Sequence, residues 1–202
     1  MEVLSQAAFW LWGAQVTWAE LFGDITGALC VWLLARQHLL NWPLGLINNV
    51  LWCVLFWHSK LYADSVLQTI FFALGAYGWW MWVFGGTGTH NSLPVRRTTR
   101  SEWIGLTVIT VIATAGFATF LAGHTDSPAP LRDASILTLS LAATYGQTQK
   151  AIESWWIWIL VDVVSVPLYI SRHLYPTAAL YVVFGLMCVG GLRSWRRALL
   201  AR

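Results

Sequence analysis

Two polar side chains lie in the middle of strongly hydrophobic stretches of this sequence. Asn48 lies within residues 42–52, and Asp162 lies within residues 156–166. When the two stretches are aligned 114 residues apart, Asn48 falls on Asp162. A polar group inside a membrane-spanning segment is costly, and a carboxylate is more costly than an amide. Matching positions of this kind predict a pocket that both stretches help to form.

Further amides and aromatic rings recur three or four residues apart, which places them on shared helix faces. Amides supply both donors and acceptors, as sugar hydroxyls require, and aromatic rings can stack on a flat ligand. An alternative for the amides is that they bond one helix to another. For Asp24, the sequence leaves open whether it lies deep in the first span or near the outer interface. The predicted substrate-binding residues are Asn48, Trp52, Gln68, Phe72, Trp79, Asp162, Tyr169 and Tyr181.

The usual catalytic and metal-binding patterns do not occur within the hydrophobic stretches. All histidines fall in loops or at the ends of those stretches, and no His-Glu-x-x-His, Cys-x-x-Cys or Ser/Lys pair lies inside them. Cys30, Cys53 and Cys188 lack paired spacing and are expected to pack as small side chains. The sequence therefore predicts no enzyme, no metal and no cofactor, with acid catalysis by Asp162 as the alternative.

The composition is that of a membrane protein. Of 202 residues, 57% are hydrophobic and 10% are charged, whereas soluble proteins carry roughly 25% charged residues. The hydrophobic residues fall in segments of about 17–25 residues, the length that crosses a bilayer core. The fifth segment is the most polar, which suits a helix shielded by its neighbours. We expect an all-α polytopic membrane protein with seven transmembrane helices, at residues 18–38, 42–59, 61–84, 103–122, 134–149, 155–171 and 175–194.

Basic residues are distributed unequally between the two sides of the membrane that these segments imply. Nine lie on the side of the C-terminus and three on the other side, and an excess of Lys and Arg marks the cytoplasm. The C-terminus is therefore expected inside, with the chain in a bacterial inner membrane. The formal charge of +3 then reflects topology and not nucleic-acid binding. The nine are Arg36, Arg96, Arg97, Arg100, Lys150, Arg193, Arg196, Arg197 and Arg202.

Tryptophan is concentrated near the ends of the hydrophobic segments. Such positions are typical of an aromatic belt at the membrane–water interface. Residues 1–17 lack the basic region of a signal peptide, and we expect them to form an interfacial helix or the start of the first span. The tryptophans assigned to segment ends are Trp18, Trp42, Trp57, Trp79, Trp82, Trp103, Trp155 and Trp195.

The second half of the chain repeats the first. After the loop that follows the stretches aligned at 114, the spacing becomes 113, with Gly78 on Gly191 and Trp82 on Trp195. Two parallel three-helix units are therefore expected, and a connecting helix restores the orientation of the second, giving a 3+1+3 arrangement. Transporters often hold their substrate near the midplane between such repeats. The expected segments are an interfacial 1–17, a first unit 18–84, a cytoplasmic linker 85–100, a connecting helix 101–122, a second unit 131–195 and a basic tail 196–202.

Several motifs resemble the PnuC family of bacterial vitamin transporters. The resemblance implies a 3+1+3 fold related to the SWEET sugar transporters, assembly as a homotrimer, and uptake of nicotinamide riboside by facilitated diffusion with trapping by a cytoplasmic kinase. Relatives carry thiamine or riboflavin, which are the alternative substrates. The motifs are Trp42-Pro43-Leu44-Gly45 with Asn48, Leu61-Tyr62-Ala63-Asp64 with Leu67-Gln68, Gly78-Trp79, and Trp155-Trp156-Ile157-Trp158 through Asp162 to Pro167-Leu168-Tyr169.

Nicotinamide riboside suits the predicted pocket because it joins a cationic pyridinium ring to a ribose. Aromatic faces attract a cation by about 0.5–2 kcal/mol, and Asp162 could balance its charge. Thiamine is also a cationic aromatic compound and fits the same logic, while neutral riboflavin fits less well. No chain of ionisable groups crosses the spans, as a proton relay would require, so we expect a uniporter that works by alternating access.

Overall fold

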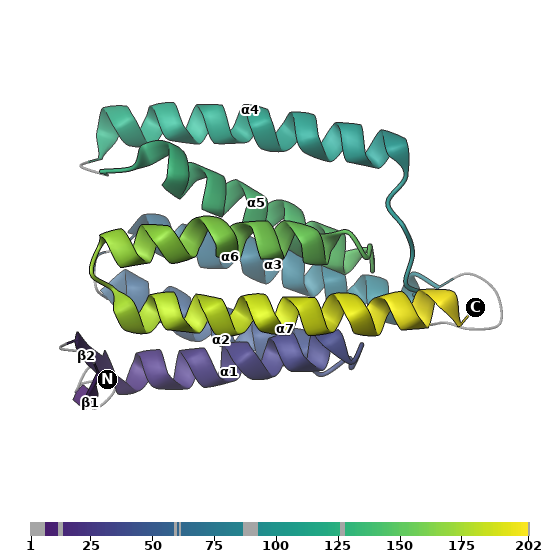
Figure 1. Cartoon of the computed structure of the whole chain (residues 1–202), viewed down its shortest axis with the longest axis horizontal. Helices are drawn as coiled ribbons and strands as arrows, with labels where there is room; N and C mark the ends of the chain where they lie inside the picture. The colour runs from purple at the N-terminus through teal and green to yellow at the C-terminus, as the bar shows by residue number, and fades with distance from the viewer. Residues whose placement is uncertain are drawn as a thin grey trace.

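The computed structural model describes residues 7–11, 14–58, 60, 62–86, 93–125 and 128–201. Seven long helices run roughly parallel or antiparallel to one another through this part of the chain (Figure 1). They agree with the seven predicted spans to within a few residues at most of their ends. Their bounds are α1 Trp18–Ala35, α2 Asn41–His58, α3 Tyr62–Phe84, α4 Arg100–His124, α5 Pro130–Thr148, α6 Ser154–Ser171 and α7 Tyr175–Leu200.

Apolar surface on these helices identifies a multi-pass membrane protein. Four helices are long and apolar enough to span a bilayer, at Asp64–Phe84, Arg100–His124, Ser154–Ser171 and Tyr175–Leu200. The remaining three contain 18 or 19 residues each, which corresponds to about 27 Å at 1.5 Å per residue. The polar helix α5 buries Thr138, Ser140 and Gln147 against its neighbours, as its composition predicted.

The N-terminal segment differs from its prediction. Strands β1, Ala7–Leu11, and β2, Ala14–Thr17, form an antiparallel hairpin in place of the expected helix. The hairpin pairs Phe9 with Val16, and aromatic and β-branched residues of this kind favour strands. The expectation of a helix here was therefore wrong for the described residues, while the remainder of 1–17 lies outside them. We call the end of the bundle that carries this hairpin the hairpin end.

Six of the helices make a closed ring of contacts. Their order around the ring is α1, α2, α3, α5, α6 and α7, with α7 packed against α1. Helix α4 lies outside the ring along α5 (Figure 1), where the hydroxyl groups of Thr114 and Thr138 lie 2.6 Å apart. Few residues of α4 are covered, and its apolar side chains face outward, as expected for a connecting helix that faces lipid.

Four tryptophans form a buried cluster at the end of the bundle opposite the hairpin. The rings of Trp42 and Trp82 meet edge to face with centroids 5.4 Å apart, and those of Trp155 and Trp195 do the same at 5.4 Å. Trp155 and Trp195 are fully buried. This tryptophan cluster corrects the prediction of an aromatic belt for these four residues, whereas Trp18, Trp57, Trp79 and Trp103 are exposed.

Close helix packing explains why these rings are buried. A Cβ atom on Gly78 would collide with the indole of Trp42, and one on Gly191 would collide with the indole of Trp155. Each glycine therefore lets a ring lie directly on the backbone of the neighbouring helix. An interfacial tryptophan has no such packing contact and keeps part of its ring in the lipid headgroup region.

A spacing of 113 residues separates most of the bounds of α1–α3 from those of α5–α7. Helix α2 begins at Asn41 and α6 at Ser154, and the left-handed residue Gln37 before α2 matches Lys150 before α6. The second left-handed pair, Lys60 and His173, has the same spacing. Backbone hydrogen bonds around Gln37, Lys150 and His173 form Schellman motifs that end their helices.

This spacing corrects the alignment drawn from sequence. Trp42 corresponds to Trp155 and not to Trp156, because only Trp155 lies on a glycine of the neighbouring helix as Trp42 does. Asp162 therefore corresponds to Asn49, and the pairing of Asn48 with Asp162 was wrong. The loop after α2 is consequently no longer than the loop after α6. The adjacent tryptophans 155 and 156 made the shifted alignment look equally good in the sequence.

Candidate functional site

A cavity of about 490 Å³ lies between α1, α2, α6 and α7 at the hairpin end. Three of its lining residues are among those predicted from sequence: Trp52, Tyr169 and Tyr181. Val16 of the hairpin, together with Leu174 and Pro176 at the α6–α7 connection, places the cavity near the surface of the bundle. Phe184 and Gly27 lie near the middle of their helices, so the cavity extends about halfway along the bundle.

Helix α1 supplies one wall, and its glycines create the space. The indole of Trp52 lies on Gly23 so closely that a Cβ there would collide with it, and Phe184 lies 3.7 Å from the position of a Cβ on Gly27. The corresponding residues of α5 are Ile136 and Ser140, which carry side chains. This difference gives a physical reason for the space beside α1.

Aromatic rings from both halves of the chain form the other walls. Trp52 and Phe56 of α2 stack with centroids 5.3 Å apart. On the opposite side, Tyr169 lies 5.0 Å from Tyr181, and Tyr181 lies 6.2 Å from Phe184. Aromatic faces of this kind hold flat rings, and they attract cations when water is excluded.

The polar groups of the cavity are few. Asp24 of α1 and Thr177 of α7 line it together with the two tyrosines. Among the described lining residues there is no Lys, Arg or His. The site can therefore hold a planar ligand that is uncharged or cationic. For an anion it offers no positively charged side chain among the described lining residues.

Asp162 does not line this cavity. Its side chain is 5% exposed and lies between α6 and α7, where Oδ2 is 3.5 Å from the position of a Cβ on Gly185. That oxygen has no hydrogen-bond partner among the described residues, and the same holds for Ser165 Oγ and Trp158 Nε1 on the same face of α6. These three unpartnered polar atoms form a line that leads from Tyr169 toward the tryptophan cluster.

The other predicted residues also lie outside the cavity. Asn48 and Gln68 are partly buried in α2 and α3, and neither lines the cavity. Phe72 and Trp79 are 38% and 40% exposed on α3. Gln68, Phe72 and Trp79 share helical spacing on α3, but α3 lies on the far side of α2 from the cavity.

Of the polar and aromatic residues that line the cavity, four were absent from the predicted set: Asp24, Phe56, Thr177 and Phe184. Phe56 follows Trp52 by one helical turn, and Phe184 follows Tyr181 by three residues, so spacing alone could have extended both faces. The signal for Asp24 was the pair of glycines that flank it, Gly23 and Gly27, because close helix approach brings a neighbouring side chain toward the opposing rings. Thr177 precedes Tyr181 by four residues, so helical spacing places it on the same face.

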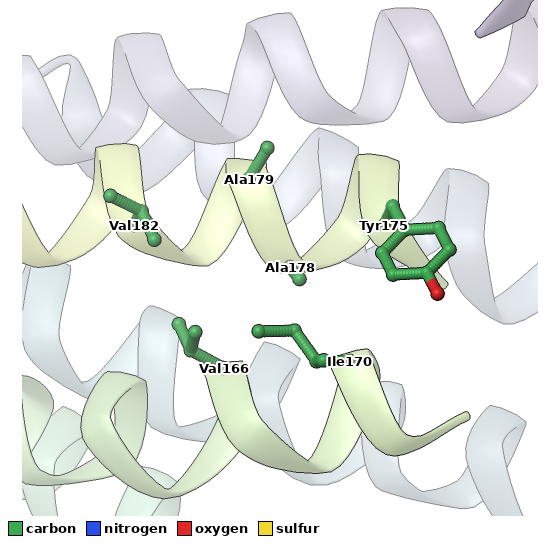
Figure 2. A pocket seen from close by; sticks show the side chains of 6 residues that line it. All are labelled: Val166, Ile170, Tyr175, Ala178, Ala179 and Val182. Atoms are coloured by element: carbon green, nitrogen blue, oxygen red, sulfur yellow. The ribbon is translucent and has the colours of Figure 1, made fainter. Parts of the chain in front are cut away.

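A second hollow, of about 700 Å³, lies along the outside of α6 and α7 (Figure 2). Val166, Ile170, Ala178, Ala179 and Val182 line it, and the hydroxyl of Tyr175 is the polar group at its edge. Although larger, this groove offers a polar ligand almost no hydrogen bonds, and it faces the region that lipid occupies. The cavity between the helices is therefore the better candidate for a polar substrate.

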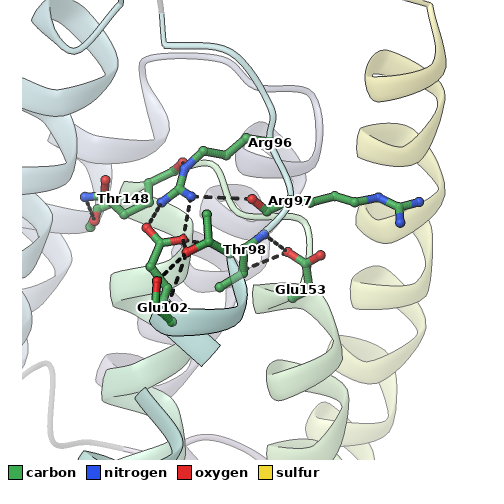
Figure 3. Close-up of polar contacts among 9 residues, drawn as sticks. Arg96, Arg97, Thr98, Glu102, Thr148 and Glu153 are labelled. Atoms are coloured by element: carbon green, nitrogen blue, oxygen red, sulfur yellow. Dashed lines mark hydrogen bonds and ion pairs between the residues drawn. The ribbon is translucent and has the colours of Figure 1, made fainter. Parts of the chain in front are cut away.

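A short strap, residues 93–99, crosses the end of the bundle that carries the tryptophan cluster. Leu93 and Val95 pack into the cluster, and Arg96 forms a parallel bridge with Ala151 in the α5–α6 connection. Thr98 donates two hydrogen bonds of 2.8 Å, from its N–H and its hydroxyl, to the carboxylate of Glu153 (Figure 3). The strap therefore ties α4 to the start of α6.

Arg96 anchors the strap to the first turn of α4. Its guanidinium donates two hydrogen bonds of 2.8 Å to the two carboxylate oxygens of Glu102 (Figure 3). These bonds raise the pKa of Arg96 above its ordinary value, and burial acts in the opposite direction. Arg96 thus keeps its charge, and α4, α5 and α6 are held together at this end.

The helix bundle and its internal cavity define a multi-pass membrane protein with a site for a small molecule. A family model described as "Nicotinamide mononucleotide transporter" matches residues 17–197, and the chain belongs to that family. This finding confirms the resemblance to PnuC proteins that the motifs carried. Because the family is one of transporters, the chain is a transporter, and the alternative of an intramembrane enzyme is set aside.

Two of the similar proteins are 25% and 28% identical to this chain. "Nicotinamide riboside transporter PnuC" of Escherichia coli is 25% identical, over 91% of this chain and 87% of the relative. "Riboflavin/roseoflavin transporter RibM" of Streptomyces davaonensis is 28% identical, over 96% of this chain and 92% of the relative. A solved structure titled "Crystal structure of the Vitamin B3 transporter PnuC" shares the fold, with a TM-score of 0.71, 22% identity, and coverage of 91% and 83% of the two chains.

Proposed function

We propose that the protein carries nicotinamide riboside across the bacterial inner membrane by facilitated diffusion, with trapping inside the cell by a cytoplasmic kinase. The observation that supports this substrate is the cavity, whose lining combines aromatic rings with the carboxylate of Asp24. A pyridinium ring is flat and cationic, so it gains from both features. The name of the Escherichia coli relative supports the same substrate.

A phosphorylated substrate fits the cavity poorly, although the family model is described by a mononucleotide. A phosphate group carries about two negative charges at neutral pH, and proteins bind it with Arg, Lys or backbone N–H groups. Among its described residues, the lining has no cationic side chain and includes Asp24. These charges favour the riboside over the mononucleotide.

Riboflavin is the second candidate, because the relative named for riboflavin and roseoflavin is 28% identical over 96% of this chain. A neutral flavin would use the ring faces of Trp52 and Tyr181 and would gain nothing from the Asp24 charge. Thiamine combines a cationic ring with a second aromatic ring and remains an alternative on the same logic as nicotinamide riboside.

The architecture we propose is a 3+1+3 arrangement of parallel repeats, like that of the SWEET transporters. A spacing of 113 residues supports it, because it separates the starts of α2 and α6 and of α3 and α7, the ends of α1 and α5 and of α2 and α6, and both pairs of left-handed residues. The units are then residues 18–84 and 131–195, joined by the linker 85–100 and the connecting helix 101–122. The outward apolar face of α4 is available for packing in the homotrimer that the PnuC resemblance implies, and the mass of the purified protein would test that assembly.

Alternating access would then proceed by relative movement of the two units. If the excess of basic residues marks the cytoplasm, the C-terminus lies inside and the cavity faces outward, with the tryptophan cluster closing the inner side. Inward opening would separate that cluster. We propose that Asp162, Asn48, Gln68, Phe72 and Trp79, none of which lines the present cavity, act in that later conformation or in the packing of the helices.

Uptake into liposomes that contain the purified protein tests this function. Radiolabelled nicotinamide riboside, its mononucleotide, thiamine and riboflavin should be compared at one concentration. We expect the riboside to equilibrate with the interior and the mononucleotide to stay outside. Preferential uptake of riboflavin would overturn the proposed substrate. Concentration of the riboside above the external level by a pH gradient alone would overturn the uniport mechanism.

A further inference from the structure

We propose that Asp24 is the residue that makes the cavity select a cationic ring over a neutral ring of the same shape. This inference deepens the proposed function and rests on it, because it concerns the same cavity. Nothing in the family name or in the names of the relatives assigns a role to this carboxylate. It is argued from the position of α1 between the aromatic walls.

The first step is the place of Asp24 beside the glycines of α1. The indole of Trp52 lies on Gly23, and the ring of Phe184 lies next to Gly27. At 100° per residue, Gly27 lies about 40° and Asp24 about 100° around the helix from Gly23, so Asp24 borders the glycine face. Asp24 lines the cavity together with these two rings, which belong to different halves of the chain.

The second step is the electrostatic setting. The tyrosine walls supply hydroxyl groups, but among the described lining residues Asp24 is the one carboxylate and no side chain is cationic. Asp162, the next carboxylate in this half of the bundle, is buried between α6 and α7. A carboxylate in the lining attracts a cationic ligand that binds beside it through the direct interaction of opposite charges. A neutral ligand gains no such interaction.

The third step is the asymmetry of the two halves. At the spacing of 113 residues, the counterpart of Asp24 is Leu137 of α5. One half of the chain therefore supplies the charge, while rings come from both. A ligand with a charged ring at one end and a neutral polyol at the other would bind in a single orientation, with its ring toward α1.

The test uses two ligands that differ in charge and hardly in shape. Nicotinamide riboside is a cation, and its 1,4-dihydro form, in which the ring has gained a hydride, is neutral. Their dissociation constants should be measured by calorimetry for the purified wild-type protein and for Asp24→Asn. A single charge pair in a poorly solvated site is worth at least one order of magnitude in affinity. We expect the wild type to prefer the cation by about tenfold or more, and Asp24→Asn to lose that preference while it binds the neutral form as before.

A matched control is Asp64→Asn, which makes the same chemical change at an exposed position on the first turn of α3. It should leave the preference for the cation unchanged. Retained binding of the neutral form by Asp24→Asn shows that the variant is folded, so loss of binding to the cation alone can be assigned to charge. If Asp24→Asn keeps the wild-type preference, the inference is wrong. If the wild type binds neither form, the proposed function fails first, and the two failures are thereby distinguished.

Discussion

Trp82 of α3 and Trp195 of α7 lie with their ring centroids 6.0 Å apart. The indole of Trp82 donates a hydrogen bond of 3.0 Å to the carbonyl oxygen of Gln147, and the indole of Trp195 donates one of 3.1 Å to that of Leu34. Each bond joins a helix of one half of the chain to a helix of the other half. In the mechanism proposed above, both bonds must break before the inner side can open.

Trp195→Phe should therefore weaken the contact between the halves. The variant keeps an aromatic ring but removes one buried hydrogen bond, which is worth about 0.5–1.5 kcal/mol. We expect a lower melting temperature and faster reaction of Cys188, which is buried in the same core, with a small thiol reagent.

Trp57→Phe is the control for this variant, because Trp57 is exposed and lies at the end of α2 away from the cluster. It should change neither the melting temperature nor the labelling of Cys188. A Trp195→Phe protein that melts earlier yet labels at the wild-type rate would show that the bond stabilises the fold without controlling the opening.

Gly191→Ala should destabilise the protein, whereas Gly190→Ala should not. A Cβ at position 191 collides with the indole of Trp155, while one at position 190 meets no atom within 4 Å. Overpacking of a well-packed core costs about 1–3 kcal/mol, and alanine is otherwise the better helix former. Thermal unfolding of both variants in one detergent measures this difference. Equal melting temperatures would contradict the close contact between the Trp155 indole and Gly191.

The sequence predicted the helices well because the length of each apolar segment is set by the bilayer. It predicted part of the cavity, since Trp52, Tyr169 and Tyr181 follow helical spacing. It could not give the relative rotation and depth of the helices, which depend on glycine contacts such as that between Gly23 and Trp52. For the same reason the sequence left the depth of Asp24 in the first span open. It also placed Trp79 among the predicted binding residues, although this side chain has helical spacing but faces outward.

Gly23→Ala should reduce binding of nicotinamide riboside more than it reduces stability. The added methyl group displaces Trp52, which is a wall of the cavity, and the ring can move into that open space. Gly105→Ala provides the control, because a Cβ there meets nothing within 4 Å. We expect the affinity measured by calorimetry to fall by about tenfold or more, as the loss of one aromatic contact implies. Wild-type affinity in Gly23→Ala would show that Trp52 does not contact the ligand.

Asp162→Asn tests the different roles proposed for Asp162 and Asp24. Because Asp162 lies behind Gly185 and outside the cavity, the amide should leave the affinity measured from the outer side unchanged. It should slow uptake, since the proposed role of Asp162 belongs to the conformation that follows. It should also raise the melting temperature, because a buried carboxylate oxygen without a partner is replaced by a neutral group. Binding measured by calorimetry, initial uptake rates in liposomes and thermal unfolding together test this pattern. Loss of affinity in Asp162→Asn with wild-type affinity in Asp24→Asn would exchange the roles assigned to the two residues.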